Sequence, residues 1–380
     1  MIKRRNFIKA SALLTVPAIF GGSGVANAQL CRPTGNRAVT TEPDSATFFP
    51  NVQPYTQALF IPPAMVDIPE SELATSGTIP QEINPNKHQR YNEFPAEQIH
   101  QQFVEEGHWN YHDEITRGTQ GQVPDGNGGF TGKGSVAWMY SGGPDDGVGV
   151  EGEFGSILST PGPTMVAHYG KPVFIRRLNR LPDAADVMMP VGYPAVSTHL
   201  HNAHTASESD GYPMDFMQVG DHWDHHYAMY LARNDPKEAL ASLWYHDHMI
   251  DFTATNVYAG LSGLAIFYDD IDTGNENDTA AGALRLPGNL EFGGDDEGNA
   301  NGYDISLLLH DVRFSADGNP TYNVFDTDGH LGDFLTVNRK VMPFMNVKPR
   351  KYRFRVYDGG PSRFYELALY NTADRDTQIG

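Results

Sequence analysis

Apolar and polar residues alternate along much of this chain in a way that predicts strands rather than helices. Each predicted strand is a short segment with apolar residues at every second position, or a short apolar run bounded by turn residues. These segments occupy residues 171–181, 261–268, 304–312, 351–357 and 364–370. Long amphipathic patterns are scarce, and residues 235–243 form the best short helical candidate. The pattern predicts an all-β fold, and the spacing of strands and turns favours β-sandwich domains.

Other stretches differ in character from these strands. Residues 29–110 are irregular and are predicted to form an N-terminal arm that wraps the body, and residues 118–160 are rich in glycine. An acidic, polar stretch at 269–278 marks a predicted domain boundary. We therefore expect an arm plus a first domain over residues 29–270, and a second, incomplete domain over residues 271–380.

The first 28 residues have the character of an export signal. Arg4 and Arg5 form a twin-arginine element, residues 10–20 are apolar, and Ala26-Asn27-Ala28 supplies a small-x-small cleavage site. The apolar stretch is too short for a permanent membrane anchor. The pattern resembles a twin-arginine signal and predicts a periplasmic or extracellular protein. Leu30 precedes Cys31 where a lipoprotein has a small residue, so no membrane anchor is expected.

The charge and the cysteine count narrow the classes of function. The formal net charge is −20, and the four basic residues of the first 28 leave −24 on the remainder. Such a surface repels nucleic acid and anionic lipid, so no nucleic-acid partner is expected. Cys31 is the single cysteine and excludes an intrachain disulfide. The 39 glycines and 26 prolines fit a β-rich fold with many turns.

Two of the histidine-rich segments contain a His-x-His pair. His199 and His201 form the first pair, and His246 and His248 form the second. In a strand, residues i and i+2 face the same side, so each pair projects two imidazoles together. Neutral imidazole suits copper, zinc, iron and nickel. The spacing alone predicts a metal site without choosing the metal, and two histidine pairs that bind no metal are the alternative interpretation.

The residues around both pairs resemble those of one family. Residues 198–201 read Thr-His-Leu-His, and Ser-Asp-Gly-Tyr-Pro follows at 209–213. Residues 243–248 read Leu-Trp-Tyr-His-Asp-His, and Asn-Val-Tyr-Ala-Gly-Leu follows at 256–261. These segments resemble the first and second copper motifs of multicopper oxidases, in particular bacterial laccases and bilirubin oxidases. Two further segments fit the same order, a turn before their first long strand and a strand of their second domain, at residues 161–164 and 349–355.

The resemblance implies the fold, the cofactor and the site residues. It implies cupredoxin-like Greek-key β-sandwich domains, with His199 on a type 2 copper and His201, His246 and His248 on the type 3 copper pair. It also implies a catalytic role for Asp210, whose carboxylate would orient a copper-bound water or relay protons; an ordinary turn aspartate is the alternative. The reaction implied is one-electron oxidation of a phenol, a pigment or a metal ion, coupled to four-electron reduction of dioxygen to water.

The sequence also departs from the family pattern. The family's cluster takes eight histidines, and the other four come from a His-Pro-x-His-x-His motif and a His-Cys-His motif, neither of which occurs in these 380 residues. The type 1 copper needs that cysteine, and Cys31 has no neighbouring histidine. We therefore expect the N-terminal portion of an oxidase, inactive alone and without a type 1 site; whether it is a fragment or a natural truncation stays open. Smaller departures are Ala203 and Arg339, at positions where glycine is common.

Several questions remain open at this stage. The competing hypothesis is an exported copper-binding or cupredoxin-like envelope protein without turnover. The identity of the reductant and the oligomeric state are not determined by the sequence. Residues 221–227 are predicted to be a polar loop, and the role of its histidines is open: His222, His225 and His226. His204 is predicted to be structural rather than a ligand.

Overall fold

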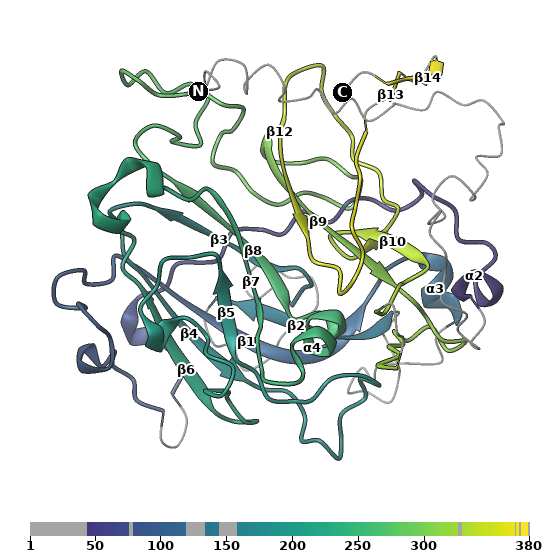
Figure 1. The fold of residues 1–380 in the computed structure, drawn as a ribbon, viewed down its shortest axis with the longest axis horizontal. Coiled ribbons are helices and arrows are strands. Elements are labelled where there is room, and N and C mark those ends of the chain that lie inside the picture. Colours follow the sequence, from purple (N-terminus) through teal and green to yellow (C-terminus); the bar gives the residue numbers. More distant parts are fainter. Residues whose placement is uncertain are drawn as a thin grey trace.

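The computed structural model describes residues 44–75, 79–118, 134–143, 158–325, 329–368, 370–371 and 374–378. The predicted export signal and Cys31 lie outside these residues. The described part is built mainly from strands, with short helices between them (Figure 1). The prediction of an all-β fold is therefore confirmed, whereas the predicted domain boundaries stay predictions.

The first unit contains two four-stranded sheets. One has the order β2-β1-β4-β6, and its strands are β1 (Gln98–Trp109), β2 (Ser135–Gly142), β4 (Val173–Asn179) and β6 (His222–Tyr227). The other has the order β3-β8-β7-β5, and its strands are β3 (Gly162–His168), β5 (Thr198–His201), β7 (Ser242–Asp247) and β8 (Ser262–Tyr268). Two of the pairings, β1 with β4 and β3 with β8, are parallel. β5 and β6 are thus edge strands of different sheets.

The two sheets enclose a common core, which makes this unit a β-sandwich. Val104, Trp138 and Ile175 of the first sheet belong to the same buried cluster as Leu200 and Tyr245 of the second. All five side chains are fully buried or nearly so. Burial of apolar area on this scale, at about 25 cal/mol per Å², is what holds the two sheets face to face.

A third sheet, outside the sandwich, follows a long connection. Residues 269–303 link β8 to a sheet of order β11-β10-β9-β12. Its strands are β9 (Asp304–Val312), β10 (Phe334–Val337), β11 (Lys340–Val341) and β12 (Arg353–Asp358), and a separate pair consists of β13 (Tyr370–Asn371) and β14 (Asp374–Gln378). In Figure 1 this third sheet lies beside the sandwich, in light green and yellow. Hydrogen bonds from Arg355 to the carbonyl of Ala241 and the hydroxyl of Ser242 join it to β7.

Helices are short wherever the structure describes them. The α-helices are α2 (Ser45–Phe48), α3 (Asp113–Gly118) and α4 (Thr253–Ala259), and the 3₁₀ turns are η3 (Glu70–Glu72), η4 (Pro85–Lys87), η5 (Ser207–Ser209), η6 (Ala232–Asn234) and η7 (Pro236–Glu238). The helix predicted over residues 235–243 is wrong, because η7 ends at Glu238 and β7 begins at Ser242. No helix among the described residues is long and apolar enough to cross a bilayer.

Most strand predictions are confirmed, and the errors have physical causes. β4, β8, β9 and β12 fall where strands were predicted, but residues 361–368 contain no strand. The turn predicted at 161–164 is already the start of β3. β1 lies inside the predicted arm and β2 inside the glycine-rich stretch. The pattern of β1 is hidden because Gln101 and Gln102 are buried polar residues, each satisfied by hydrogen bonds.

The polar loop predicted at residues 221–227 is also wrong. These residues form β6, which pairs antiparallel with β4. Asp224 is a strand residue because its carboxylate accepts two hydrogen bonds, at 2.8 and 2.9 Å, from the buried guanidinium of Arg176. His225 and His226 are buried in the same strand. This polar segment can lie against the core because Asp224, His225 and His226 each form hydrogen bonds.

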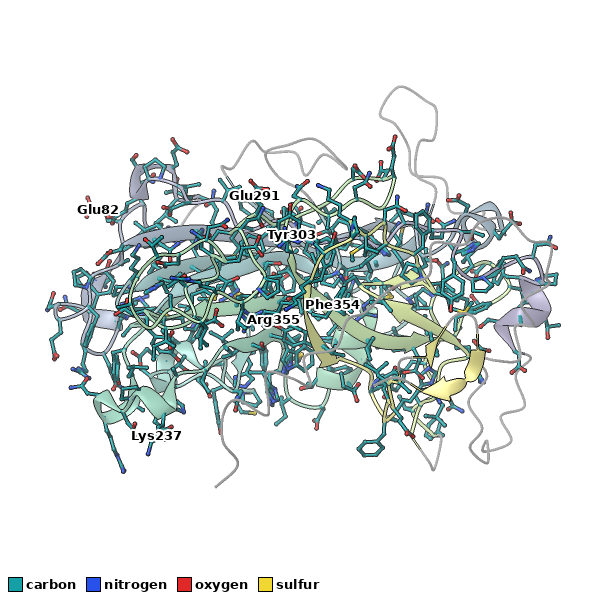
Figure 2. The ribbon with its side chains drawn as sticks, turned by 90° about the horizontal axis from the view of Figure 1, so that it is seen from above. Glu82, Lys237, Glu291, Tyr303, Phe354 and Arg355 are labelled. Atoms are coloured by element: carbon teal, nitrogen blue, oxygen red, sulfur yellow. The ribbon has the colours of Figure 1, made fainter. Side chains whose placement is uncertain are left out.

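The alternation predicted for residues 351–357 exists, but its buried face carries charge. Arg355 is buried and forms two hydrogen bonds, at 2.8 and 2.7 Å, with the carboxylate of Asp304, whereas Val356 is 44% exposed. Figure 2 shows Arg355 and Phe354 near the middle of the molecule and Lys237 at its periphery. The strand is therefore held by a buried ion pair on one face rather than by a wholly apolar one.

The chain before β1 lies along both units. The amide of Leu59 donates to the carbonyl of Phe344 at 2.7 Å, and the amide of Met65 donates to the carbonyl of Thr164 at 2.8 Å. Nearer its start, the amide of Ser45 donates to the carboxylate of Asp333 at 2.7 Å. These contacts connect the segment before β1 both to the sandwich and to the unit that contains the third sheet.

Candidate functional site

Strand pairing brings the two His-x-His motifs together. β5 carries the first motif and pairs antiparallel with β7, which carries the start of the second. In this register His199 lies directly opposite His246, and Leu200 lies opposite Tyr245. Directly opposite residues project to the same face of a sheet. The histidines therefore face one way, while Leu200 and Tyr245 enter the core.

The four imidazole rings form one compact cluster. Five ring pairs have centroid separations between 5.2 and 5.7 Å, and together they connect all four predicted ligands: His199, His201, His246 and His248. His246 is buried, and the other three rings lie closer to the surface. The structure thus brings together the four histidines that the sequence predicted as metal ligands.

Backbone carbonyls orient two of the rings. Nδ1–H of His246 donates to the carbonyl of Asp247 at 2.7 Å, and Nδ1–H of His199 donates to the carbonyl of Asp210. These contacts place the lone pair of both rings on Nε2. Nδ1 of His201 lies 3.1 Å from Nε2 of His246 and donates its proton to it. Nδ1 of His248 is buried without a hydrogen-bond partner.

The surroundings keep His201 and His246 neutral. Burial, together with the neighbouring histidines of the cluster and against the opposing hydrogen bond to Asp247, lowers the pKa of His246 to about 3. Burial, followed by the proximity of His199 and His248, also lowers the pKa of His201. A metal ion binds the neutral form of imidazole, so His201 and His246 are in their ligand form at neutral pH.

The cluster fits part of a metal site. Two imidazole nitrogens bound to one ion at about 2 Å are separated by roughly 3 Å, and the 3.1 Å between His201 Nδ1 and His246 Nε2 matches this value. The unpartnered Nδ1 of His248 offers a further donor atom. Within the described ranges, however, no group of three or more histidine, cysteine or carboxylate side chains is arranged so that it could hold a metal ion by itself. The four rings therefore fit part of a metal site rather than a whole one.

Two residues that the sequence interpretation did not single out complete this wall. The ring of Trp244 lies 4.2 Å from that of His246 and 5.6 Å from that of His201. Asp247, between the two histidines of the second motif, is fully buried and accepts backbone amides from Ser197 at 2.8 Å and from Met249 at 3.1 Å. Burial raises the pKa of Asp247 to about 7, although these hydrogen bonds oppose the shift. The sequence signal was a carboxylate at the inward position of a strand.

Asp210 lies at the edge of the cluster. Its carboxylate accepts a hydrogen bond from the hydroxyl of Thr205 at 2.9 Å and lies 3.6 Å from Nδ1 of His199. Its side chain is 46% exposed. The carboxylate therefore reaches both solvent and the back of the His199 ring, on the side away from the free Nε2.

The remaining histidines near the motifs do not join the cluster. His204 is half exposed and lies 4.0 Å from the carboxylate of Glu238. His226 donates from Nε2 to the carbonyl of Phe94 at 2.7 Å, and His225 donates from Nε2 to the carbonyl of Thr198 at 3.1 Å. His225 thus contacts the strand that carries His199, although it is no neighbour in sequence.

The chain is similar in sequence to known proteins over part of its length. The chain is 32% identical over 244 residues to the laccase of Bacillus subtilis, an alignment that covers 56% of this chain and 42% of that protein. It is 31% identical over 221 residues to the bilirubin oxidase of Albifimbria verrucaria, covering 58% of this chain and 32% of that protein. The chain thus spans less than half the length of these curated relatives.

Solved structures and family models add the following. A variant of the multicopper oxidase McoA from Aquifex aeolicus superposes with a TM-score of 0.49 at 20% identity, covering 75% of this chain and 47% of that one. No family model matches the sequence. Over somewhat more than half of its length, the chain is similar to multicopper oxidases named laccase and bilirubin oxidase.

Proposed function

We propose that this chain is the N-terminal part of a laccase-like multicopper oxidase and supplies one wall of its copper cluster. One observation carries the proposal: four imidazoles from β5, β7 and the residue after β7 form one cluster, in which five ring pairs have centroid separations of 5.2 to 5.7 Å. The similarity to laccases and a bilirubin oxidase supports copper as the metal. Imidazole nitrogens are suitable copper ligands.

The four histidines have distinct proposed roles. His199 would bind a type 2 copper, and the type 3 pair would be held by His201, His246 and His248. Copper bound there would supply the one-electron chemistry by which dioxygen is reduced to water with four electrons. The carbonyls of Asp210 and Asp247 fix the rings of His199 and His246, so that their Nε2 lone pairs are already aimed before metal arrives.

Asp210 is proposed to handle protons. Reduction of dioxygen to water consumes protons, which have to reach the cluster from solvent. The Asp210 carboxylate is half exposed and lies 3.6 Å from the His199 ring. It is therefore positioned to pass protons inward or to orient a water molecule near the cluster.

The remaining parts of the catalytic machinery are proposed to come from outside this chain. The full cluster takes four further histidines, and electrons enter through a type 1 copper that needs a cysteine beside a histidine; these 380 residues contain neither motif. The chain alone is thus proposed to bind copper without oxidising substrate. The substrates of the whole protein are proposed to be dioxygen and a phenolic, pigment or metal-ion reductant.

Copper titration of the purified chain tests the ligand assignment. Wild type should bind copper and lose Trp244 fluorescence, because the indole lies 4.2 Å from His246. His201→Ala should lower the copper stoichiometry, whereas His204→Ala, which changes a half-exposed histidine outside the cluster, should not. Unchanged stoichiometry in His201→Ala would refute the assignment.

Activity measurements separate the oxidase from a copper-binding protein without turnover. The chain alone should not couple oxidation of a phenolic dye to oxygen consumption. Coexpression with the third domain of a relative should restore turnover if this chain is part of an oxidase. Copper binding that stays without turnover in the combined protein would favour the binding-protein alternative.

Export by the twin-arginine route is proposed from the first 28 residues. Twin-arginine signals direct folded proteins across the membrane, so the protein could load its metal before export. Replacing Arg4 and Arg5 by lysine should retain the protein inside the cell, as fractionation would show. Continued export of that variant would contradict the proposal.

A further inference from the structure

We propose that His225 is a positioning residue for His199, acting through the backbone of Thr198 from the opposite sheet of the sandwich. The inference rests on the proposed function, because His199 matters as a ligand only if the cluster binds metal. His225 lies in β6, in the segment whose histidines had no assigned role in the sequence interpretation.

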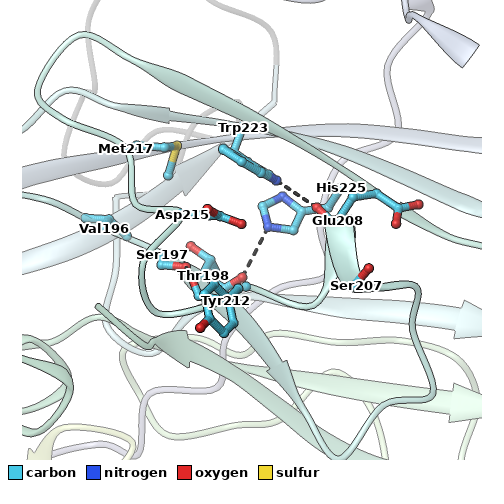
Figure 3. Close-up of a pocket in the computed structure, with 11 residues that line it drawn as sticks. Val196, Ser197, Thr198, Ser207, Glu208, Tyr212, Asp215, Met217, Trp223 and His225 are labelled. Carbon is cyan, nitrogen blue, oxygen red and sulfur yellow. Dashed lines mark hydrogen bonds between the residues drawn. The ribbon is translucent and has the colours of Figure 1, made fainter. Parts of the chain in front are cut away.

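The starting point is the free edge of the strand that carries His199. Among the described strands, β5 is the last of its sheet and pairs with β7 alone. Backbone groups on its outer edge need partners other than a strand, because a buried carbonyl without a hydrogen bond is costly. The carbonyl of Thr198 finds its partner in His225, whose Nε2–H donates to it at 3.1 Å (Figure 3).

The donor is itself held in one state. His225 is 1% exposed, and its Nδ1 has no hydrogen-bond partner. It lines a tightly filled pocket together with Thr198, Gly211 and Trp223. Since Nε2 faces a carbonyl oxygen, the proton resides on Nε2. Burial lowers the pKa of His225 well below its ordinary value and keeps the ring neutral.

The turn after the first motif packs closely against the backbone of Thr198 and His199. Gly211 has φ +80°, and a Cβ at this position would lie 2.3 Å from the carbonyl oxygen of Thr198 and 2.6 Å from Cα of His199. Asp210, one residue earlier, accepts the Nδ1–H of His199. One turn, at residues 210 and 211, therefore fixes both the backbone and the ring of His199. The hydrogen bond from His225 holds Thr198 against this turn.

β6 also anchors this turn. The indole N–H of Trp223 donates to the carbonyl of Glu208 at 2.9 Å, and the amide of His226 donates to the hydroxyl of Ser209 at 2.9 Å. Figure 3 shows the bonds of Trp223 and His225 side by side in the pocket. One edge strand thus positions both the ligand strand and the turn that orients the His199 ring. Loss of the His225 donor should let Thr198 and His199 shift together.

The experiment compares three variants of the full chain. His225→Phe keeps a ring but removes the donor, and His225→Gln keeps an N–H near the position of Nε2. His226→Phe is the matched control, because it removes another buried bond from the same strand to a carbonyl, that of Phe94. If the Phe variant does not fold, His225→Asn replaces it, since the shorter amide does not reach Thr198.

Two readouts distinguish positioning from mere stabilisation. In the metal-free chain, ¹⁵N-histidine NMR should show His199 as a single Nδ1–H tautomer in wild type, His225→Gln and His226→Phe, and as a mixture in His225→Phe. Copper affinity should fall about tenfold or more in His225→Phe and change little in the other two variants, with an altered copper EPR spectrum in His225→Phe alone.

The outcomes separate this inference from the proposed function. Equal tautomers and equal copper affinities in His225→Phe and His226→Phe would overturn the positioning role. A wild-type chain that binds no copper would overturn the proposed function, and the role of His225 toward a metal would fall with it. Recovery of both readouts in His225→Gln would support the donor, rather than the imidazole ring as such, as the positioning group.

Discussion

At Gly211 a side chain would overlap the backbone of the strand that carries His199. Alanine at this position should destabilise the chain by about 3 kcal/mol or more, because a left-handed φ costs about 1–2 kcal/mol and the added Cβ would overlap the Thr198 carbonyl. Gly220→Ala is the control: its φ is +85°, but nothing lies within 4 Å of the added Cβ, so about 1 kcal/mol is expected. Urea unfolding of both variants measures the difference, and equal losses would contradict the overlap.

For single residues, the sequence predicts which side of a strand a side chain faces better than it predicts which groups that side chain contacts. The period of two along a strand was enough to predict that His199 and His201, and likewise His246 and His248, face one side. It could not predict that His225 would reach Thr198, because that contact joins the edges of two different sheets. Nor does spacing show that Asp247 is buried between its histidines, since this depends on the amides that surround it.

Among the elements, β12 shows how a charged face can hold a strand in place. Asp304→Asn should destabilise the chain by about 3–5 kcal/mol, because it leaves the buried guanidinium of Arg355 without its carboxylate. Val356→Thr, on the exposed face of the same strand, should change stability by about 0.5 kcal/mol or less. Chemical denaturation of the two variants is the measurement, and a small loss in Asp304→Asn would show that water reaches Arg355.

Two of the strands that were predicted correctly, β8 and β9, have mainly apolar residues on their buried faces. Both strands are buried along most of their length. β1 and β6 were missed because their buried faces include glutamine and histidine, whose hydrogen-bond partners lie on other strands. A pattern of apolar residues along one segment does not contain those partners, so the polar strands became visible only in the fold.

For the whole molecule, buried neutral histidines imply sensitivity to acid. Burial lowers the pKa of His225, in the sandwich, and the pKa of His310, in β9 of the third sheet, well below 6.5. The unfolded chain then binds more protons than the folded one below pH 6.5, so stability is present above that pH and is lost as pH falls. Each group contributes up to about 1.4 kcal/mol per pH unit.

Urea midpoints of the metal-free chain between pH 7.5 and 5.5 check this prediction. Asp247 acts in the opposite sense, because its pKa is raised to about 7 and its contribution falls as pH rises. His310→Phe isolates one histidine: both ring nitrogens of His310 lack partners, so the change removes no hydrogen bond, and the variant should lose less stability on acidification. Parallel pH curves for wild type and variant would contradict the assignment.

The parallel pairing of β3 with β8 also determines when the site can form. Met165 lies opposite Ala265, 100 residues later, and β8 is the strand on which β7 and then β5 are laid. Contacts over such separations form slowly, because the chain must close a long loop before they stabilise it. During synthesis both histidine motifs are therefore made before the strand that anchors them. The order of translation is therefore expected to delay assembly of the proposed copper ligands until residue 268 has been synthesised.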